Sequence, residues 1–258
     1  MTTDPITSSR NQRLRELKRL QQRKYRREQG LFVTEGEDLV AEALRHGTVP
    51  QTVFSVKGAG LPFSLPETVE HVEASADALS AVSSLGSGSR VIGVFQVPDA
   101  RELEPATASA VYLHDVADPG NVGTVLRAAH AFAADTVVLS ERTADPFGPK
   151  AVRASMGALF AVPVARAGVE DARAALGLRA IALAPNAGRP LRELDLAAPA
   201  LFVLGAERSG LPESVLAACD EVAHVPLAPG GADSLNVAMT ATLCLYESAV
   251  HRLSPSHE

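Results

Sequence analysis

The chain has 258 residues, of which 46% are hydrophobic, only 4% are aromatic and none is Trp, so Ala, Val and Leu build its core. This length allows one large or two modest domains. No apolar run approaches the roughly 20 residues that a membrane helix needs, and Cys219 and Cys244 lack metal-ligand spacing, which indicates reduced core thiols in a cytoplasmic protein.

The formal net charge of −6 argues against a nucleic-acid partner only if the charge is evenly spread, and it is not. Residues 1–30 hold nine basic and three acidic residues, a formal charge of +6 that leaves −12 for residues 31–258. The nine are Arg10, Arg13, Arg15, Lys18, Arg19, Arg23, Lys24, Arg26 and Arg27. A basic arm on an acidic body indicates a polyanionic partner, with a solvated helix face or a disordered tail as the alternatives.

Apolar spacing predicts the elements of the first part of the chain. Leu14, Leu17 and Leu20 recur at spacing three, which predicts one helix over residues 10–27 with a narrow apolar stripe. The further expected strands lie at 31–33, 52–56, 70–72 and 90–97, and the expected helices at 38–45 and 75–85. Such alternation over residues 1–98 is long enough to form an α/β domain of its own.

A linker rich in proline and charge follows at residues 98–108, and the alternation then resumes with more apolar strands. The expected strands are 111–113, 136–139, 159–164, 179–183, 200–204 and 221–225. The expected helices are 122–133, 150–156, 169–176, 214–218 and 235–252. Near-continuous apolar strands predict a mainly parallel sheet covered on both faces, so residues 109–258 form a second α/β domain.

Three of these strands run into turns that carry polar side chains. After the first, Asn121 is expected to cap a helix in which Arg127 lies less than two turns from the start. From there the long Arg127 side chain is expected to reach back toward the mouth of a pocket. After the strand at 200–204, Gly205 permits a ligand to approach the backbone closely, and Glu207 can accept hydrogen bonds.

The third turn runs from Pro226 to Asn236, with Ser234 at the expected N-cap of the last helix. Because ligands bind beyond the carboxyl ends of parallel strands, the three turns predict one shared site. Each turn by itself also fits an ordinary strand-to-helix connection. The sequence has no phosphate-binding loop, no dinucleotide fingerprint after the first strand of either domain and no Cys/His metal cluster.

Together and in this order, the motifs resemble the SpoU (TrmH-like) family of RNA ribose methyltransferases in the SPOUT superfamily. The matching positions are Asn121, Gly123, Arg127, then Gly205, Glu207, Gly210, Leu211, Pro212, and last Pro226, Gly231, Ser234, Leu235, Asn236 and Val237. The stretch Arg153 to Ala158 is similar to the family's Arg-x-Ser-x-Gly segment. Residues 32–36 look like part of the RNA substrate-binding domain that many members carry.

The resemblance implies a trefoil-knotted methyltransferase domain at 109–258 behind a smaller RNA-binding domain at 1–98. It implies a homodimer with the site near the subunit interface. The lack of a long apolar run and of a Cys/His cluster predicts no membrane and no metal. It also implies S-adenosylmethionine as the cofactor, held at positions that correspond to Leu204, Gly205, Val225, Leu227 and Leu235. The loop from Pro226 to Ser234 is one residue longer than the usual pattern. Of the five cofactor positions, the assignment of Leu227 is the one that this extra residue affects most.

The family's chemistry assigns the catalytic work to Arg127, which would stabilise the charge that develops on a ribose hydroxyl. The residues that would orient Arg127 and the ribose are Asn121, Glu207, Ser234 and Asn236. The residues of the basic arm expected to bind RNA are Arg10, Arg13, Lys18, Arg23, Lys24, Arg26 and Arg27.

The sequence thus favours 2′-O-ribose methylation of structured RNA, with ribosomal RNA as the favoured substrate. A transfer RNA substrate is the alternative within the family. An RNA-binding or ribosome assembly factor with a degenerate cofactor site is the alternative outside enzymes.

Overall fold

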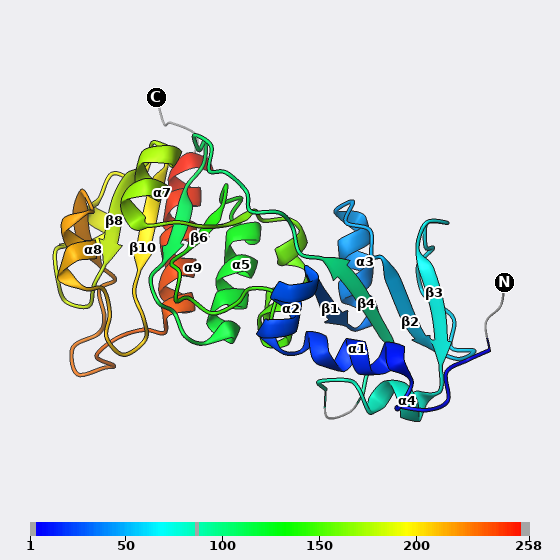
Figure 1. The fold of residues 1–258 in the computed structure, drawn as a ribbon. Coiled ribbons are helices and arrows are strands. Elements are labelled where there is room, and N and C mark those ends of the chain that lie inside the picture. The colour runs from blue at the N-terminus through cyan, green and yellow to red at the C-terminus, as the bar shows by residue number, and fades with distance from the viewer. Residues whose placement is uncertain (1–3, 86–87, 254–258) are drawn as a thin grey trace. The chain divides into compact units, whose positions relative to one another are not determined.

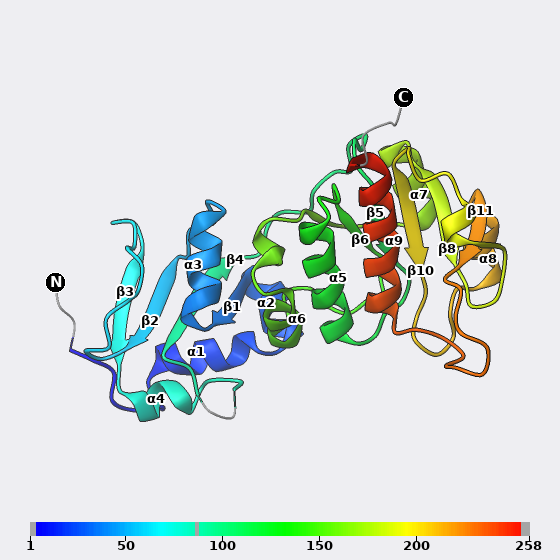
Figure 2. The same ribbon diagram turned by 180° about the vertical axis from the view of Figure 1, so that it is seen from behind.

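The computed structural model describes residues 4–85 and 88–253. The chain forms two compact units (Figure 1, Figure 2). The first unit comprises the residues up to Asp99 together with Asp145–Phe160, and the second comprises Ala100–Ala144 and the chain from Ala161 onward. No helix of the described part is long and apolar enough to cross a membrane.

A four-stranded sheet in the order β1-β4-β2-β3 forms the centre of the first unit. Its strands are β1 Leu31–Glu35, β2 Thr52–Val56, β3 Glu70–Ala74 and β4 Val91–Gln96. Strand β4 pairs antiparallel with both of its neighbours, whereas β2 and β3 are parallel. All four strands confirm the predicted ones to within two residues at each end.

The helices of the first unit are α1 Gln12–Leu20, α2 Arg23–Gln29, α3 Glu37–Arg45, α4 Ala76–Ser80 and α6 Pro149–Ser155. The single helix predicted over 10–27 is wrong, because Gln22 takes an extended conformation (φ −97°, ψ 133°) that separates α1 from α2. The predicted apolar stripe is nevertheless correct, since Leu14, Leu17 and Leu20 are buried in the core on one face of the sheet. Helix α4 keeps the predicted cap, in which Ser75 accepts from the Ala78 amide, but it ends at Ser80.

The second unit is built on a seven-stranded sheet in the order β7-β6-β5-β10-β8-β11-β9, in which every neighbouring pair is parallel. Its strands are β5 Ala110–Leu113, β6 Val137–Leu139, β7 Val164–Arg166, β8 Arg179–Leu183, β9 Arg189–Pro190, β10 Ala200–Leu204 and β11 Glu221–His224. Its helices are α5 Pro119–Ala131, α7 Val169–Leu176, α8 Glu213–Ala217 and α9 Val237–Leu253.

Helices cover both faces of this sheet, as the apolar strands predict. Helices α5 and α9 lie side by side on one face, and α7 lies on the other (Figure 1, Figure 2). The order of the strands reverses between β5 and β10, so their carboxyl ends form the switch point at which open α/β sheets bind ligands.

One predicted strand of the second part of the chain is wrong. Residues 159–164 do not form a strand: Ala158–Phe160 is a 3₁₀ turn, and β7 starts only at Val164. Leu159 and Val162 of this stretch are buried, and Phe160 packs in an aromatic cluster of the first unit. Burial without alternation does not distinguish a strand from such a segment.

Candidate functional site

The first polar turn follows β5 and leads into α5. Asp118, and not Asn121, caps this helix: its carboxylate accepts a hydrogen bond of 2.6 Å from the Gly120 amide. The cap predicted for Asn121 is therefore wrong, because Asn121 already lies in the first turn of α5. Its side-chain amide is free to face the neighbouring strand ends.

The second turn follows β10 and closes on itself. The Gly210 amide donates to the Ala206 carbonyl at 2.9 Å, and these two residues form a β-bridge. A Cβ on Gly205 would lie 2.3 Å from the carbonyl carbon of Gly210 and 2.6 Å from the Leu211 nitrogen. Gly205 is thus needed first for the close approach of this chain's own backbone.

The third turn ends at α9. Asn236 caps this helix, since its Oδ1 accepts from the Ala238 amide at 2.8 Å. The cap predicted for Ser234 is wrong, because α9 starts at Val237, two residues later than expected. Ser234 instead lines a cavity next to this turn.

A chain of hydrogen bonds joins the three turns. The Asn121 Nδ2 donates to Glu207 Oε1 at 2.6 Å, and the Asn236 Nδ2 donates to Asn121 Oδ1 at 3.1 Å. Asn236 is itself held by the start of α9, so the network ties the first turns of α5 and α9 to the turn after β10. Asn121 thus contacts two residues that are distant in sequence: Glu207, 86 positions away, and Asn236, 115 positions away.

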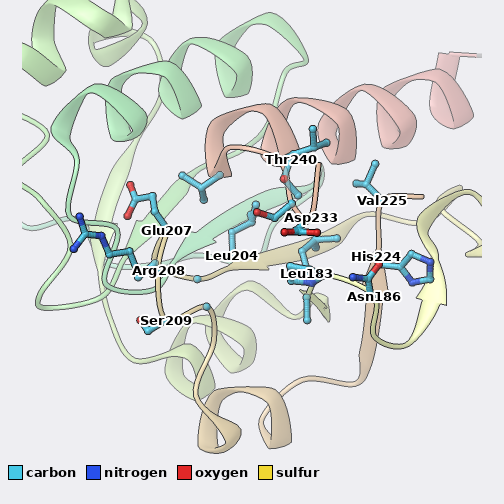
Figure 3. A pocket seen from close by; sticks show the side chains of 18 of the residues that line it. Leu183, Asn186, Leu204, Glu207, Arg208, Ser209, His224, Val225, Asp233 and Thr240 are labelled. Carbon is cyan, nitrogen blue, oxygen red and sulfur yellow. The ribbon is translucent and has the colours of Figure 1, made fainter. Parts of the chain in front are cut away.

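A cavity of about 350 Å³ opens beside this network, at the carboxyl ends of β8, β10 and β11 (Figure 3). Its lining includes all five residues expected to hold a cofactor, which are Leu204, Gly205, Val225, Leu227 and Leu235. Glu207 and Ser234 line it as well. Its volume falls within the roughly 300–1,000 Å³ that is typical of small-molecule sites.

Six polar residues of the cavity escape the sequence analysis: Asn186, Arg208, Ser209, His224, Asp233 and Thr240. Figure 3 shows Asn186 and His224 at one end, Glu207 and Arg208 at the other, and Asp233 between them. The His224 Nδ1 lies 3.1 Å from the Ala187 carbonyl; since a carbonyl only accepts, Nδ1 carries the proton.

Asn186 was the one of these that the sequence could have revealed. It follows β8 in a Pro-Asn-Ala-Gly turn, so, like the other three polar turns, this turn comes directly after a strand of the parallel sheet. Asn186 has φ +56°, which Asn tolerates better than most residues.

Arg127 is not part of this network. It is exposed on α5 and does not line the cavity, and within the described part of the chain its side chain makes no hydrogen bond or ion pair. Six residues along a helix correspond to a rotation of about 240°, so Arg127 and Asn121 point in different directions from α5. The sequence expectation that Arg127 reaches back to the pocket mouth is not met by its placement within one chain.

The basic arm is folded into helices α1 and α2. Most of the cations expected to bind RNA are exposed there: Arg10, Lys18, Arg23, Lys24 and Arg27. Arg13 is half-buried; it forms an ion pair with Glu70 and lies over the Phe54 ring, 5.5 Å from its centroid.

Arg26 differs from the others and corrects the expectation. It is only 5% exposed, and its guanidinium forms an ion pair with Asp145 at 2.6 Å. A buried guanidinium that is already paired cannot reach a phosphate without breaking this contact. Its role is therefore within the fold of the first unit.

Comparison with known proteins bears on both units. The model of the SpoU rRNA Methylase family matches residues 108–246, which are more than half of the chain and include all seven strands of the second unit's sheet. The chain belongs to this family. The model of the MRM3-like substrate binding domain matches residues 11–93, which include α1, α2, the strands β1 to β3 and the first half of β4.

Known members of the SpoU family resemble the chain over nearly its whole length. It is 34% identical to the 23S rRNA (guanosine(2553)-2′-O)-methyltransferase RlmP of Bacillus subtilis, over 93% of this chain and 97% of RlmP.

Among solved structures, the AdoMet-bound rRNA methyltransferase from Sinorhizobium meliloti superposes with a TM-score of 0.85 at 30% identity, covering 97% of this chain and 99% of that one. AviRb from Streptomyces viridochromogenes, in complex with AdoMet, gives a TM-score of 0.82 at 26% identity, covering 95% of this chain and 99% of AviRb.

Proposed function

We propose that this protein transfers a methyl group from S-adenosylmethionine to a ribose 2′-hydroxyl of 23S ribosomal RNA. The observation that carries the proposal is the hydrogen-bonded set Asn121, Glu207 and Asn236 beside a cavity lined by the five expected cofactor residues. The similarity to RlmP over nearly the full length of both chains favours a ribosomal substrate.

The cavity suits S-adenosylmethionine by its size and its lining. Apolar side chains of Leu204, Val225, Leu227 and Leu235 offer a surface for an adenine ring. The carboxylate of Asp233 provides a partner for a cationic group. When bound, the cofactor supplies an electrophilic methyl group.

This chain's own residues then have to hold the ribose and stabilise charge on its hydroxyl oxygen. We assign charge stabilisation to Arg127, whose guanidinium stays protonated and offers five donors. Asn121, Glu207, Ser234 and Asn236 orient the ribose, because their network fixes the positions of the three turns. Such positioning contributes much of the rate in a transfer that needs mainly alignment.

We further propose that the active form is a homodimer. Four large apolar side chains of α9 are between 37% and 60% exposed, at spacing four, three and four, so they form one stripe along the helix. They are Met239, Leu243, Tyr246 and Val250. An exposed apolar stripe of this kind is typical of an interface, and a second copy is the occupant that the family resemblance names.

The homodimer also explains the placement of Arg127. Helix α5 packs beside α9, and Arg127 is exposed on α5. We propose that Arg127 faces the second copy. The active site would then be completed across the interface. Light scattering that finds a monomer at micromolar concentration would contradict this part of the proposal.

We assign RNA binding to residues 1–98, whose compact unit also contains Asp145–Phe160, and methyl transfer to the rest of residues 109–258. Both act where ribosomal RNA lies, in the cytoplasm. Exposed cations on α1 and α2 give the substrate-binding part its affinity for phosphates. Among the described residues, no cluster suited to a metal is present, and the proposed reaction uses none. The trefoil knot that the family resemblance implies stays a prediction.

The test is transfer of tritium from labelled S-adenosylmethionine into unmodified 23S ribosomal RNA, with transfer RNA as a parallel substrate. We expect label in 23S RNA only, mapped by primer extension to one 2′-O-methylated nucleotide; the guanosine that RlmP modifies is the first to examine. Label in transfer RNA alone would show that transfer RNA, and not ribosomal RNA, is the substrate. Binding of RNA without cofactor binding would instead support an assembly factor.

A further inference from the structure

Residues 145–160 belong to the first unit, although in chain order they stand between β6 and β7 of the second unit's sheet. Helix α6 packs on β1 of the first unit and lies next to α2 (Figure 2). The chain therefore passes between the two units three times, after Asp99, after Ala144 and after Phe160.

A buried ion pair attaches this segment to α2. The Arg26 Nε and Nη2 donate to Asp145 Oδ2 at 3.0 and 2.6 Å, and Nη1 donates to the Leu20 carbonyl at 2.8 Å. Arg26 is 5% exposed, and only 17% of the Asp145 side chain is exposed. Removal of one partner would leave the other charge buried without compensation.

An aromatic cluster attaches the same segment to the sheet. Phe32 and Phe95 are register partners on β1 and β4. The Phe147 ring lies 5.1 Å from Phe32, and the Phe160 ring lies 6.2 Å from Phe32 and 5.2 Å from Phe95. The two strand residues are almost fully buried, and residues 145–160 cover this face of the sheet together with α3.

Two further contacts fit the segment closely to the first unit. The Arg153 Nη1 donates to Ser84 Oγ at 2.6 Å. A Cβ on Gly157 would lie 2.2 Å from Glu42 Cγ on α3. The substrate-binding fold is thus completed by a segment that lies outside residues 11–93.

We propose that residues 145–160 act as a lock that holds α2 and the sheet of the RNA-binding unit in place, with Arg26 and Asp145 as positioning residues for the RNA. The inference rests on the proposed function. Helix α2 presents exposed cations to RNA, and Arg26 ties α2 to a segment whose two ends continue into β6 and β7. This pair controls how bound RNA is held for methyl transfer, and Arg26 does not contact phosphate.

The experiment uses the full chain in four forms: wild type, Asp145→Ala, the double variant Arg26→Met/Asp145→Leu, and Asp38→Ala as a control. Asp38 is an exposed carboxylate of the first unit, in the first turn of α3. The double variant replaces the ion pair by an apolar pair of similar size, a change that buried pairs often tolerate. Three measurements are made on each: hydrogen–deuterium exchange, S-adenosylmethionine affinity by calorimetry, and the kcat and KM for 23S RNA with the salt dependence of RNA binding.

For Asp145→Ala we expect faster exchange in residues 23–35 and 145–160, with unchanged exchange in β10 and α9 and cofactor affinity within about twofold. Misalignment of the bound RNA should lower kcat at saturating RNA about tenfold or more. The slope of RNA affinity against salt should stay at the wild-type value, because no phosphate contact is lost. The double variant should restore both exchange and kcat, and Asp38→Ala should behave as wild type.

Three outcomes would overturn the inference. Wild-type kcat in Asp145→Ala, despite faster exchange, would show that the lock has no effect on the reaction. A reduced salt slope in the double variant would show that Arg26 contacts phosphate after all. Loss of cofactor binding in Asp145→Ala would place the segment in the support of the cavity. A wild-type chain that methylates no RNA would instead refute the proposed function, while the exchange data would still report on the lock.

Discussion

The polar turns around the cavity and the basic helices α1 and α2 hold their side chains in different ways. Around the cavity, Asn121, Glu207 and Asn236 come from three distant parts of the chain and fix one another by hydrogen bonds. On α1 and α2, exposed cations such as Lys18 and Arg27 follow one another along two short helices.

The difference matches two kinds of task. Transfer chemistry requires reacting groups held within narrow geometric limits, whereas attraction of a phosphate backbone requires only charge within reach. Single substitutions should therefore have large effects at the turns and small, roughly equal effects on the helices. Arg127 tests this division between the two groups of residues, because it is assigned to the chemistry but is exposed like a surface cation.

The largest effect is expected for Arg127→Ala. If Arg127 stabilises charge in the transition state, kcat should fall roughly 10²–10³-fold, while cofactor affinity stays unchanged because Arg127 does not line the cavity. Single-turnover methylation of 23S RNA measures this. Arg127→Lys keeps the charge without the planar fork and serves as the control; full activity of the alanine variant would place Arg127 with the surface cations.

Gly205→Ala should have the next largest effect. Its new Cβ would meet the Gly210 carbonyl carbon at 2.3 Å, where backbone has to move, and such overpacking costs about 1–3 kcal/mol. We expect a lower melting temperature and weaker S-adenosylmethionine binding together. Gly168→Ala is the matched control, because its Cβ would meet only the end of the Asp171 side chain at 3.3 Å; equal losses in the two variants would contradict the tight turn.

Glu207→Ala should lower kcat/KM about tenfold, the scale of one hydrogen bond to a charged group. Because Glu207 is exposed, the melting temperature should change little. Glu207→Gln retains an acceptor for Asn121 and should lose less. The double variant with Asn121→Ala should lose less than the product of the single effects, since the two residues share one contact; independent effects would argue against a shared network.

The smallest effects should come from single cations of α1 and α2. Lys18→Ala should reduce the slope of log affinity for RNA against log salt by roughly one and should leave kcat unchanged. Arg13→Ala should reduce it less, because the Arg13 charge is already paired with Glu70. Filter binding at several salt concentrations measures both. A fall in kcat for Lys18→Ala would remove the proposed division between the two regions.

Local signals in the sequence determined most of the elements and the identity of the site. Apolar strands at 179–183 and 200–204 appear at the predicted positions, because fully buried parallel strands leave an uninterrupted apolar run. The turns at Asn121, Glu207 and Asn236 could be linked to one another by their place after parallel strands and by their order in the family motifs. The contacts themselves could not be predicted, since no local pattern reports a contact across 115 residues.

The tertiary structure alone decided which partner each polar group takes. Asp118 and Asn236 cap their helices in place of the predicted Asn121 and Ser234, because the exact first residue of a helix depends on its packing. Arg26 reads as one more cation of a basic arm, and only the fold buries it against Asp145, 119 residues away. Charge can be counted along a chain, but burial and pairing depend on which distant segment folds back to cover it.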